Sequence, residues 1–190
     1  RGGARRWKGR SAIPPAVEAG LRTAGCGVED NMNENQDMRG ALARFTGEWT
    51  GRNQLWFEPG TPVHECETAA SVVAVARGCC VAIRYEWEEA GAIQEGLLVV
   101  RNAPEVGAED MVWVDSFHTG GQFMRLRGEA DADGRVAALG SYPAPEGPDW
   151  GWRIVLGSDG TDDLHLLMYN ITPDGSVYPA VETRLARRHR

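Results

Sequence analysis

Residues 79–101 read CCVAIRYEWEEAGAIQEGLLVVR, and they carry a pattern that recurs along most of the chain. Apolar residues occupy alternate positions from Val81 to Trp87, with mainly charged residues between them. Because side chains alternate between the two sides of an extended chain, this spacing predicts a strand with one buried and one solvated face. Residues 89–92 (Glu-Ala-Gly-Ala) then predict a tight turn, since glycine readily adopts the positive φ that such turns require.

The same alternation and the same kind of turn recur down the rest of the chain. Glycine-containing turns such as residues 173–175 (Pro-Asp-Gly) separate runs in which apolar side chains share one face. One such face is expected to hold Val177, Val181, Thr183 and Leu185. The pattern predicts ten strands, at 48–57, 63–76, 79–88, 93–101, 111–118, 121–130, 134–142, 150–158, 163–171 and 177–187.

Consecutive strands joined by short turns form an antiparallel meander, and ten of them without covering helices would leave exposed edges. Closure removes those edges, so we expect an all-β fold, a closed antiparallel meander barrel of about ten strands. A barrel of this strand number has room for a ligand cavity. Before the first strand, Met38, Leu42 and Phe45 share one helical face and Asp37 stands at an N-cap position, which predicts a short helix over 37–45.

Composition and charge exclude several classes of protein. The 190 residues carry a formal net charge of −7, and their apolar and charged contents are those of a globular protein. No apolar run approaches the ~18–20 residues of a membrane-spanning helix, so we expect no membrane association. Residues 1–31 hold six basic and three acidic side chains, which leaves the remainder strongly acidic. Since phosphate backbones are bound by basic surfaces, this balance predicts no nucleic-acid partner.

Residues 1–31 show neither strand nor helix periodicity. We expect a disordered tail or a non-native upstream segment there, with Met32 as an alternative start, and a single domain over 32–190.

The cysteines are Cys26, Cys66, Cys79 and Cys80. They lack the paired spacing of zinc ligands, so no metal site is predicted. Without a secretory signal pattern, free thiols favour a reducing, cytoplasmic location.

Several motifs resemble known barrels. Residues 47–51, with the pattern Gly-x-Trp-x-Gly, are similar to the opening of calycin-type barrels, which include lipocalins, fatty-acid-binding proteins and nitrobindins. Residues 113–118 (WVDSFH), 140–153 (GSYPAPEGPDWGWR) and 169–173 (YNITP) resemble DUF1579, a lipocalin-like bacterial family of unknown function, over roughly residues 38–188. The resemblance implies a lipocalin-like barrel and supplies no substrate.

The similarity to nitrobindins raises haem as an alternative cofactor, although none is predicted from the residues themselves. The nitrobindin opening continues with a further glycine where this chain has Asn53, and its haem-binding histidine lies late in the sequence. The late histidines here are His165, whose alternation with leucines favours an outward-facing side chain, and His189 near the end of the chain.

Asp115 lies between Trp113 and Phe117 on one face of a predicted strand. An aromatic, apolar setting would raise the pKa of this carboxyl and prepare it for acid–base chemistry. The alternatives are a solvated carboxylate at the barrel rim and an ion pair with an arginine such as Arg153.

Ser116 and His118 are expected on the opposite face of the same strand, with Cα atoms ~6.6 Å apart. A nucleophilic serine would need an orienting acid and an oxyanion hole, and the G-x-S-x-G elbow is missing from the sequence. The catalytic candidates are Asp115, His118 and Arg153.

Clustered aromatic residues with a few polar neighbours are typical of a small-molecule cavity, whose mouth we expect at the segment 142–152. The predicted ligand-binding residues are Trp49, Asn53, Trp113, Asp115, Phe117, Tyr142, Trp150, Trp152 and Arg153. These residues favour a barrel that binds a small, mostly apolar molecule. The alternatives are a small-molecule hydrolase or isomerase using Asp115 and His118 at the barrel rim, and a haem protein. A homodimer is also compatible with the sequence.

Overall fold

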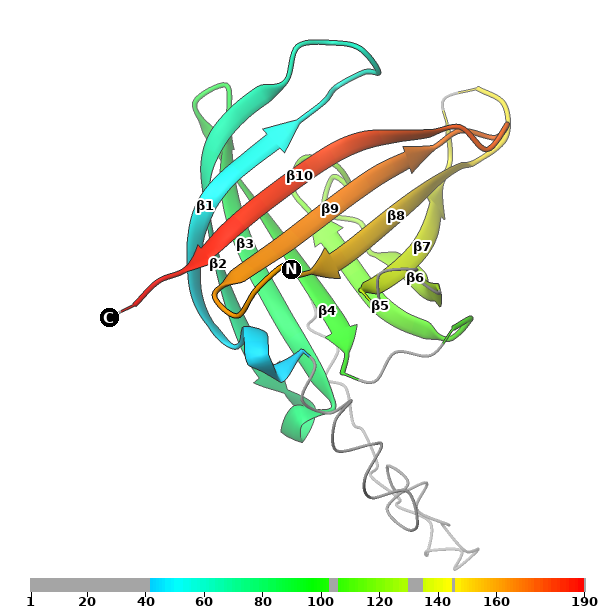
Figure 1. The fold of residues 1–190 in the computed structure, drawn as a ribbon. Coiled ribbons are helices and arrows are strands. Elements are labelled where there is room, and N and C mark those ends of the chain that lie inside the picture. Colours follow the sequence, from blue (N-terminus) through cyan, green and yellow to red (C-terminus); the bar gives the residue numbers. More distant parts are fainter. Residues whose placement is uncertain (1–41, 103–105, 130–134, 145, 190) are drawn as a thin grey trace, which may run out of the picture. The chain divides into compact units, whose positions relative to one another are not determined.

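A computed structural model describes residues 42–102, 106–129, 135–144 and 146–189. Each strand pairs antiparallel with its neighbours in sequence, and β1 pairs with β10, so the sheet closes into a barrel (Figure 1). The closed meander barrel predicted from the alternating pattern is thereby confirmed, with strand ends that differ from the predicted ones by a few residues. The strands are β1 (Gly47–Leu55), β2 (His64–Val75), β3 (Cys80–Glu89), β4 (Ala92–Arg101), β5 (Glu109–Asp115), β6 (Met124–Glu129), β7 (Val136–Tyr142), β8 (Trp150–Gly157), β9 (Asp163–Ile171) and β10 (Val177–Arg187).

Alternate residues of the strands point into the barrel and form one continuous apolar core. In β3 the apolar residues at alternate positions from Val81 to Trp87 are buried, as their spacing predicts. In β10 the predicted face is wrong for Val177, which is 55% exposed. A bulge between Pro179 and Val181 inserts one residue against β9, and this inverts the side to which the preceding residues point.

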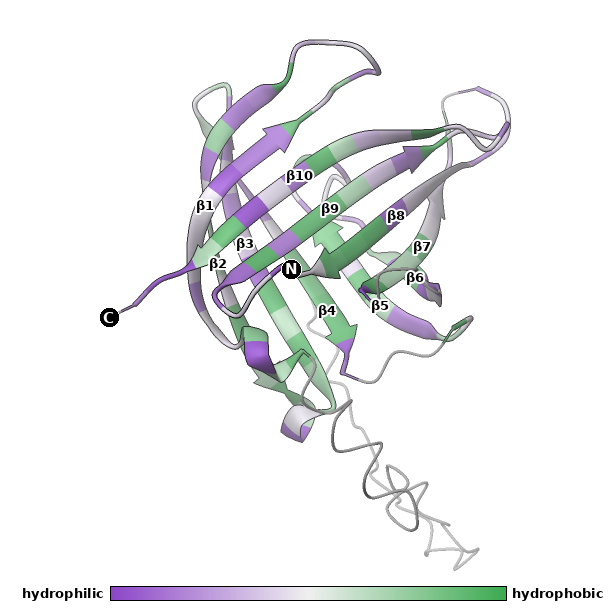
Figure 2. Ribbon diagram, viewed as in Figure 1, coloured by the Kyte–Doolittle hydropathy of each residue, from purple (hydrophilic) through white to green (hydrophobic). Residues whose placement is uncertain are grey.

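The two ends of the barrel differ in character. The connections β1–β2, β3–β4, β5–β6, β7–β8 and β9–β10 lie at one end, called here the open end. The other, closed end carries two short 3-10 helices, η1 (Ala43–Phe45) and η2 (Ala76–Gly78). Figure 2 shows β2, β3 and β4 more hydrophobic toward the closed end and more hydrophilic toward the open end.

Trp49 belongs to the closed end, which corrects its prediction as a cavity-lining residue. It is the third residue of β1 and only 1% exposed. Its indole N–H donates to the carbonyl oxygen of Phe45 at 2.8 Å, and the guanidinium of Arg187 lies 4.3 Å from its ring centroid. Because inward-facing side chains near the start of β1 lie at the closed end of the barrel, Trp49 is part of the core at that end.

The helix predicted over 37–45 is described only in its last residues, which form the 3-10 helix η1. Residues 37–41, the segment 1–31 and Cys26 lie outside the described residues. Among the residues that the structure describes, no helix has the length and apolar character to span a membrane.

Candidate functional site

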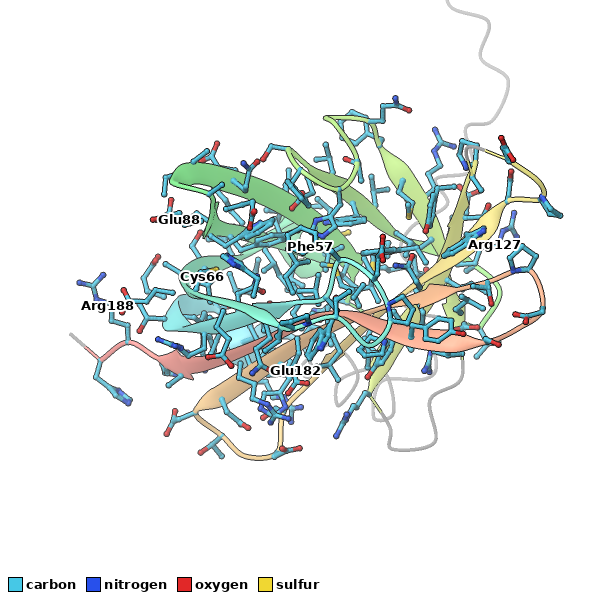
Figure 3. The ribbon with its side chains drawn as sticks, turned by 90° about the horizontal axis from the view of Figure 1, so that it is seen from above. Phe57, Cys66, Glu88, Arg127, Glu182 and Arg188 are labelled. Atoms are coloured by element: carbon cyan, nitrogen blue, oxygen red, sulfur yellow. The ribbon has the colours of Figure 1, made fainter. Side chains whose placement is uncertain are left out.

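A pocket of about 400 Å³ lies at the open end, between the β5–β6 connection and strands β6 to β9. Its wall includes Trp113, His118, Tyr142 and Trp152. Figure 3 views the barrel from this end and shows Phe57, on the β1–β2 connection, near the middle of the view. Charged side chains such as those of Glu88, Arg127 and Glu182 lie around the outside.

A larger and shallower groove of about 910 Å³ crosses β1, β2 and β3. The glutamates along it, including Glu65 and Glu86, are exposed to solvent. The smaller pocket instead contains buried polar atoms and a set of aromatic rings. These features are typical of a ligand site, so the smaller pocket is the candidate functional site.

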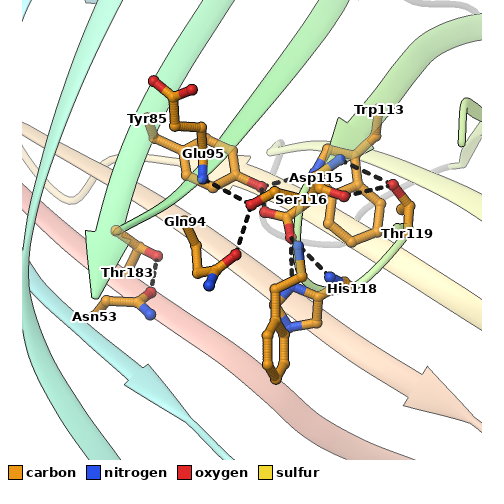
Figure 4. A network of polar contacts seen from close by, with 11 residues as sticks. Asn53, Tyr85, Gln94, Glu95, Trp113, Asp115, Ser116, His118, Thr119 and Thr183 are labelled. Carbon is orange, nitrogen blue, oxygen red and sulfur yellow. Dashed lines mark hydrogen bonds and ion pairs between the residues drawn. The ribbon is translucent and has the colours of Figure 1, made fainter. Parts of the chain in front are cut away.

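Asp115 organises the polar part of this site (Figure 4). It is the last residue of β5, and its side chain is fully buried. One carboxylate oxygen, Oδ1, accepts the backbone N–H groups of Phe117 and His118, both at 2.8 Å, and lies 3.1 Å from His118 Nδ1. The other oxygen accepts the hydroxyl of Tyr85 at 2.8 Å. The carboxylate therefore accepts from four donors, three at Oδ1 and one at Oδ2.

These donors reverse the pKa shift expected from the sequence. Burial opposes ionisation of Asp115, but the hydrogen bonds from His118, the charge that His118 carries when it is protonated, and the bond from Tyr85 together outweigh it. The pKa of the Asp115 carboxyl is therefore lower than its ordinary value, not raised. Asp115 is thus an ionised orienting group and not a proton donor at neutral pH.

The phenol ring of Tyr85 lies over Gly96, and its hydroxyl reaches the Asp115 carboxylate beyond it. The register places Tyr85 of β3, Gly96 of β4 and Asp115 of β5 in one row across the sheet. A Cβ atom on Gly96 would lie 2.0 Å from Tyr85 Cζ, so only glycine leaves room for the phenol ring. The Tyr85 hydroxyl also accepts the indole N–H of Trp113 at 2.8 Å. Burial, followed by the charge of Asp115, raises the pKa of Tyr85 well above its ordinary value, so its hydroxyl stays protonated and donates.

The ionised carboxylate fixes the tautomer of His118. Because Asp115 Oδ1 can only accept, we infer that the hydrogen of the neutral imidazole resides on Nδ1, which faces it. Nε2 is then left with a lone pair. This atom is buried and has no hydrogen-bond partner among the described residues.

An aromatic box surrounds the imidazole of His118. The ring centroids of Trp87, Trp113, Phe117 and Trp152 lie 5.7, 5.8, 5.1 and 5.6 Å from that of His118. The indoles of Trp113 and Trp152 stack on each other with an interplanar angle of 9°. The indole nitrogen of Trp152 is the second buried polar atom of the pocket that has no partner within the described residues.

The structure brings most of the predicted ligand-binding residues to the open end. Trp113, Tyr142 and Trp152 line the pocket, and Phe117 closes one side of the box. The Tyr142 hydroxyl donates to Asn170 Oδ1 at 2.6 Å across the pocket wall, and burial raises the pKa of this phenol.

Two further predicted residues do not belong to the pocket wall. Trp150 is half-buried and pairs with Tyr142 at the start of β8. Asn53 lies inside the barrel but apart from the Asp115 network, where its Oδ1 accepts the hydroxyl of Thr183 at 2.6 Å (Figure 4).

Arg153 does not belong to the site. It alternates with the inward-facing residues of β8, so it projects from the outer face and pairs with Glu129 at 3.0 Å. Ser116 and His118 do not share a face, because β5 ends at Asp115 and the chain turns there. The Ser116 hydroxyl donates to the side-chain amide oxygen Oε1 of Gln94 at 2.7 Å.

The one group of potential metal ligands among the described residues lies elsewhere. Asp159, Asp163 and His165 place ligand atoms within 4.8 Å of one another on the closed-end side of β9. His165 faces outward, as its alternation with leucines predicts, and its ring nitrogens lie 3.3 Å from Asp163 and 3.7 Å from Asp159. Both ring nitrogens of His165 therefore face carboxylates.

Comparison with protein families agrees with the motifs noted in the sequence. The family model described as "Protein of unknown function (DUF1579)" matches residues 34–187. The chain belongs to this family. A comparison with curated proteins finds no match. The DUF1579 match covers every strand of the barrel and the whole of the pocket.

Sequence reasoning missed three residues that shape the site of this DUF1579 barrel. Trp87 and Tyr85 alternate with charged residues in β3, so their inward direction was readable, but their proximity to His118 and Asp115 depends on strand register. Asn170 lies in the motif 169–173 and pairs with Trp152 across the β8–β9 ladder. Its polar side chain on an inward position was the signal for a functional role.

Proposed function

We propose that this barrel binds a small, mostly apolar molecule in the pocket beside His118. The aromatic wall of the pocket carries the proposal, because apolar walls with a few directed polar groups are what small-molecule sites have in common. A volume of about 400 Å³ suits a ligand of one to three fused rings or a comparable chain.

Native mass spectrometry of the gently purified protein, combined with titration of tryptophan fluorescence with naphthalene-type probes, tests this function. Trp113 and Trp152 line the pocket, so a bound probe should quench their emission. Trp152→Phe should reduce the response, and Trp56→Phe, at a half-buried position outside the pocket wall, is the matched control. A protein that carries no bound molecule and shows no fluorescence response to any probe would contradict the proposal.

A second candidate function is hydrolysis or isomerisation of a small molecule, with His118 as the general base. The supporting observation is the 3.1 Å contact between Asp115 Oδ1 and His118 Nδ1, which orients the imidazole with Nε2 as a proton acceptor. In ester hydrolysis His118 would take a proton from the attacking water and return it to the leaving alcohol. Release of naphthol from naphthyl acetate tests this role. A rate above the buffer background that disappears in His118→Phe supports it, and a rate equal in the two proteins contradicts it.

A further inference from the structure

Two residues of the pocket wall, His118 and Trp152, carry side-chain nitrogen atoms of opposite hydrogen-bonding character. In the neutral form of the ring, His118 Nε2 carries a lone pair, because the single ring hydrogen faces Asp115. The indole Nε1 of Trp152 can only donate. Their rings are neighbours, with centroids 5.6 Å apart, and both nitrogens are buried without a partner among the described residues. Leaving such groups unpaired is unfavourable, so a ligand or an ordered water that pairs them is favoured.

We propose that the pocket recognises a planar heteroaromatic molecule through an adjacent N–H and C=O on one ring edge, as in a ring lactam. The inference rests on the binding function proposed above and specifies the ligand class. The ligand N–H would donate to His118 Nε2, and its carbonyl oxygen would accept the indole N–H of Trp152. The flat aromatic surfaces of Trp87, Trp113 and Phe117 around His118 suit a planar ring.

Charge at the site favours a neutral ligand over an anion such as a carboxylate. The groups that face the imidazole are the Asp115 carboxylate from β5 and the protonated Tyr85 hydroxyl behind it from β3. Tyr142 from β7 and Arg125 from β6 line the pocket, but Arg125 is 73% exposed and lies 3.7 Å from Glu109. An anionic ligand would therefore place a second negative charge near Asp115 and would need a proton on His118. A lactam edge pairs both nitrogens without any proton transfer.

Access to the two nitrogens requires a small rearrangement, since neither atom reaches solvent in this structure. Phe117 is the neighbour best placed to move. It lies on the β5–β6 connection, its ring is 5.1 Å from that of His118, and it is already 40% exposed. Its displacement loses less buried apolar area than that of Trp113, which is 1% exposed.

Calorimetric titration with carbostyril, a benzo-fused ring lactam, and with its N-methyl derivative tests the proposal. Methylation removes the N–H and leaves the carbonyl. We expect carbostyril to bind at least about tenfold more tightly than the N-methyl compound, the equivalent of one buried hydrogen bond. In His118→Phe this preference should disappear, because phenylalanine keeps the ring but has no acceptor. A purely steric preference against the methyl group would survive in that variant and would overturn the proposal.

Trp152→Phe provides an independent measurement, and it keeps the test valid if His118→Phe does not fold. It should weaken carbostyril about tenfold, because the carbonyl loses its donor, and it should retain the preference over the N-methyl compound. Equal binding of the two compounds by the unmodified protein would overturn the lactam inference and leave the binding function standing. Tighter binding of naphthoate, with uptake of a proton, would also overturn it in favour of an acid. Failure of every aromatic probe would contradict the binding function itself.

Discussion

Replacing Asp115 with asparagine should destabilise the barrel by about 2–4 kcal/mol. The carboxylate accepts four hydrogen bonds, from two backbone N–H groups, the imidazole and the Tyr85 hydroxyl. Asparagine keeps one acceptor oxygen for the backbone groups, but its NH₂ group then faces the hydroxyl hydrogen of Tyr85. One buried hydrogen bond is lost, and the others lose the contribution of the negative charge. Removing the charge is not a gain, because the lowered pKa shows that the folded protein favours the ionised form despite burial.

Urea unfolding followed by far-UV circular dichroism measures this change, provided that the m-value stays constant. Asp149→Asn, at an exposed position, is the control, and its free energy of unfolding should lie within about 0.5 kcal/mol of that of the unmodified protein.

The pH dependence of the free energy of unfolding gives a second readout. Because the pKa of Asp115 is lower in the folded protein than its ordinary value of 3.8, its stabilisation is present above that value and is lost as pH falls through the folded value. Asp115→Asn should lack this part of the acid-induced loss. A destabilisation below about 1 kcal/mol would refute the assignment of a fully hydrogen-bonded carboxylate.

Three further substitutions test other parts of the fold. Gly96→Ala should lower the free energy of unfolding in urea by about 3 kcal/mol, because the new methyl group would lie 2.0 Å from Tyr85 Cζ and displace the phenol ring. An unchanged free energy of unfolding would contradict the position of the Tyr85 ring over this glycine. Asp163→Asn should lose less stability than the unmodified protein as the pH falls from 3.8 to about 2. Hydrogen bonds from Ser158 and from neighbouring backbone groups lower the pKa of the Asp163 carboxyl to about 2 in the folded state. An acid unfolding curve identical to that of the unmodified protein would contradict this loop geometry. Arg187→Lys should cost about 1–2 kcal/mol and shift the fluorescence of Trp49, because lysine cannot stack on the indole while donating to two carbonyl oxygens; an unaltered spectrum would exclude this closed-end contact.

The barrel was largely predictable from the sequence because its signals are local. Alternation from Val81 to Trp87 predicted a strand over 79–88, and the structure has it over Cys80–Glu89. The turn residues between the strands marked the hairpins, and the connectivity of a meander follows from hairpins alone. The alternating spacing alone does not reveal the bulge before Val181, and its one local signal is Pro179, which cannot donate to a ladder.

The polar network was not predictable in the same way, because it depends on register and on a turn made by one side chain. Alternation of Trp113, Asp115 and Phe117 indicated that the strand continued to residue 118. In the structure the Asp115 carboxylate accepts the N–H groups of Phe117 and His118, which ends β5 and turns the imidazole back toward the carboxylate. The row of Tyr85, Gly96 and Asp115 likewise requires the pairing of three strands.

Asp115 belongs both to the hydrogen-bonded fold and to the proposed ligand site, and this determines which variants are informative. Asp115 ends β5, pairs with Tyr85 and sets the tautomer of His118, so its substitution changes stability and the pocket together. Loss of binding in Asp115→Asn would therefore not distinguish a missing contact from a displaced β5–β6 connection. Trp152 Nε1 makes no hydrogen bond to the described residues, so Trp152→Phe removes a donor from the pocket without breaking one that holds the barrel together. A loss of carbostyril affinity in that variant that naphthalene-type probes do not share would locate recognition at the unpaired indole nitrogen.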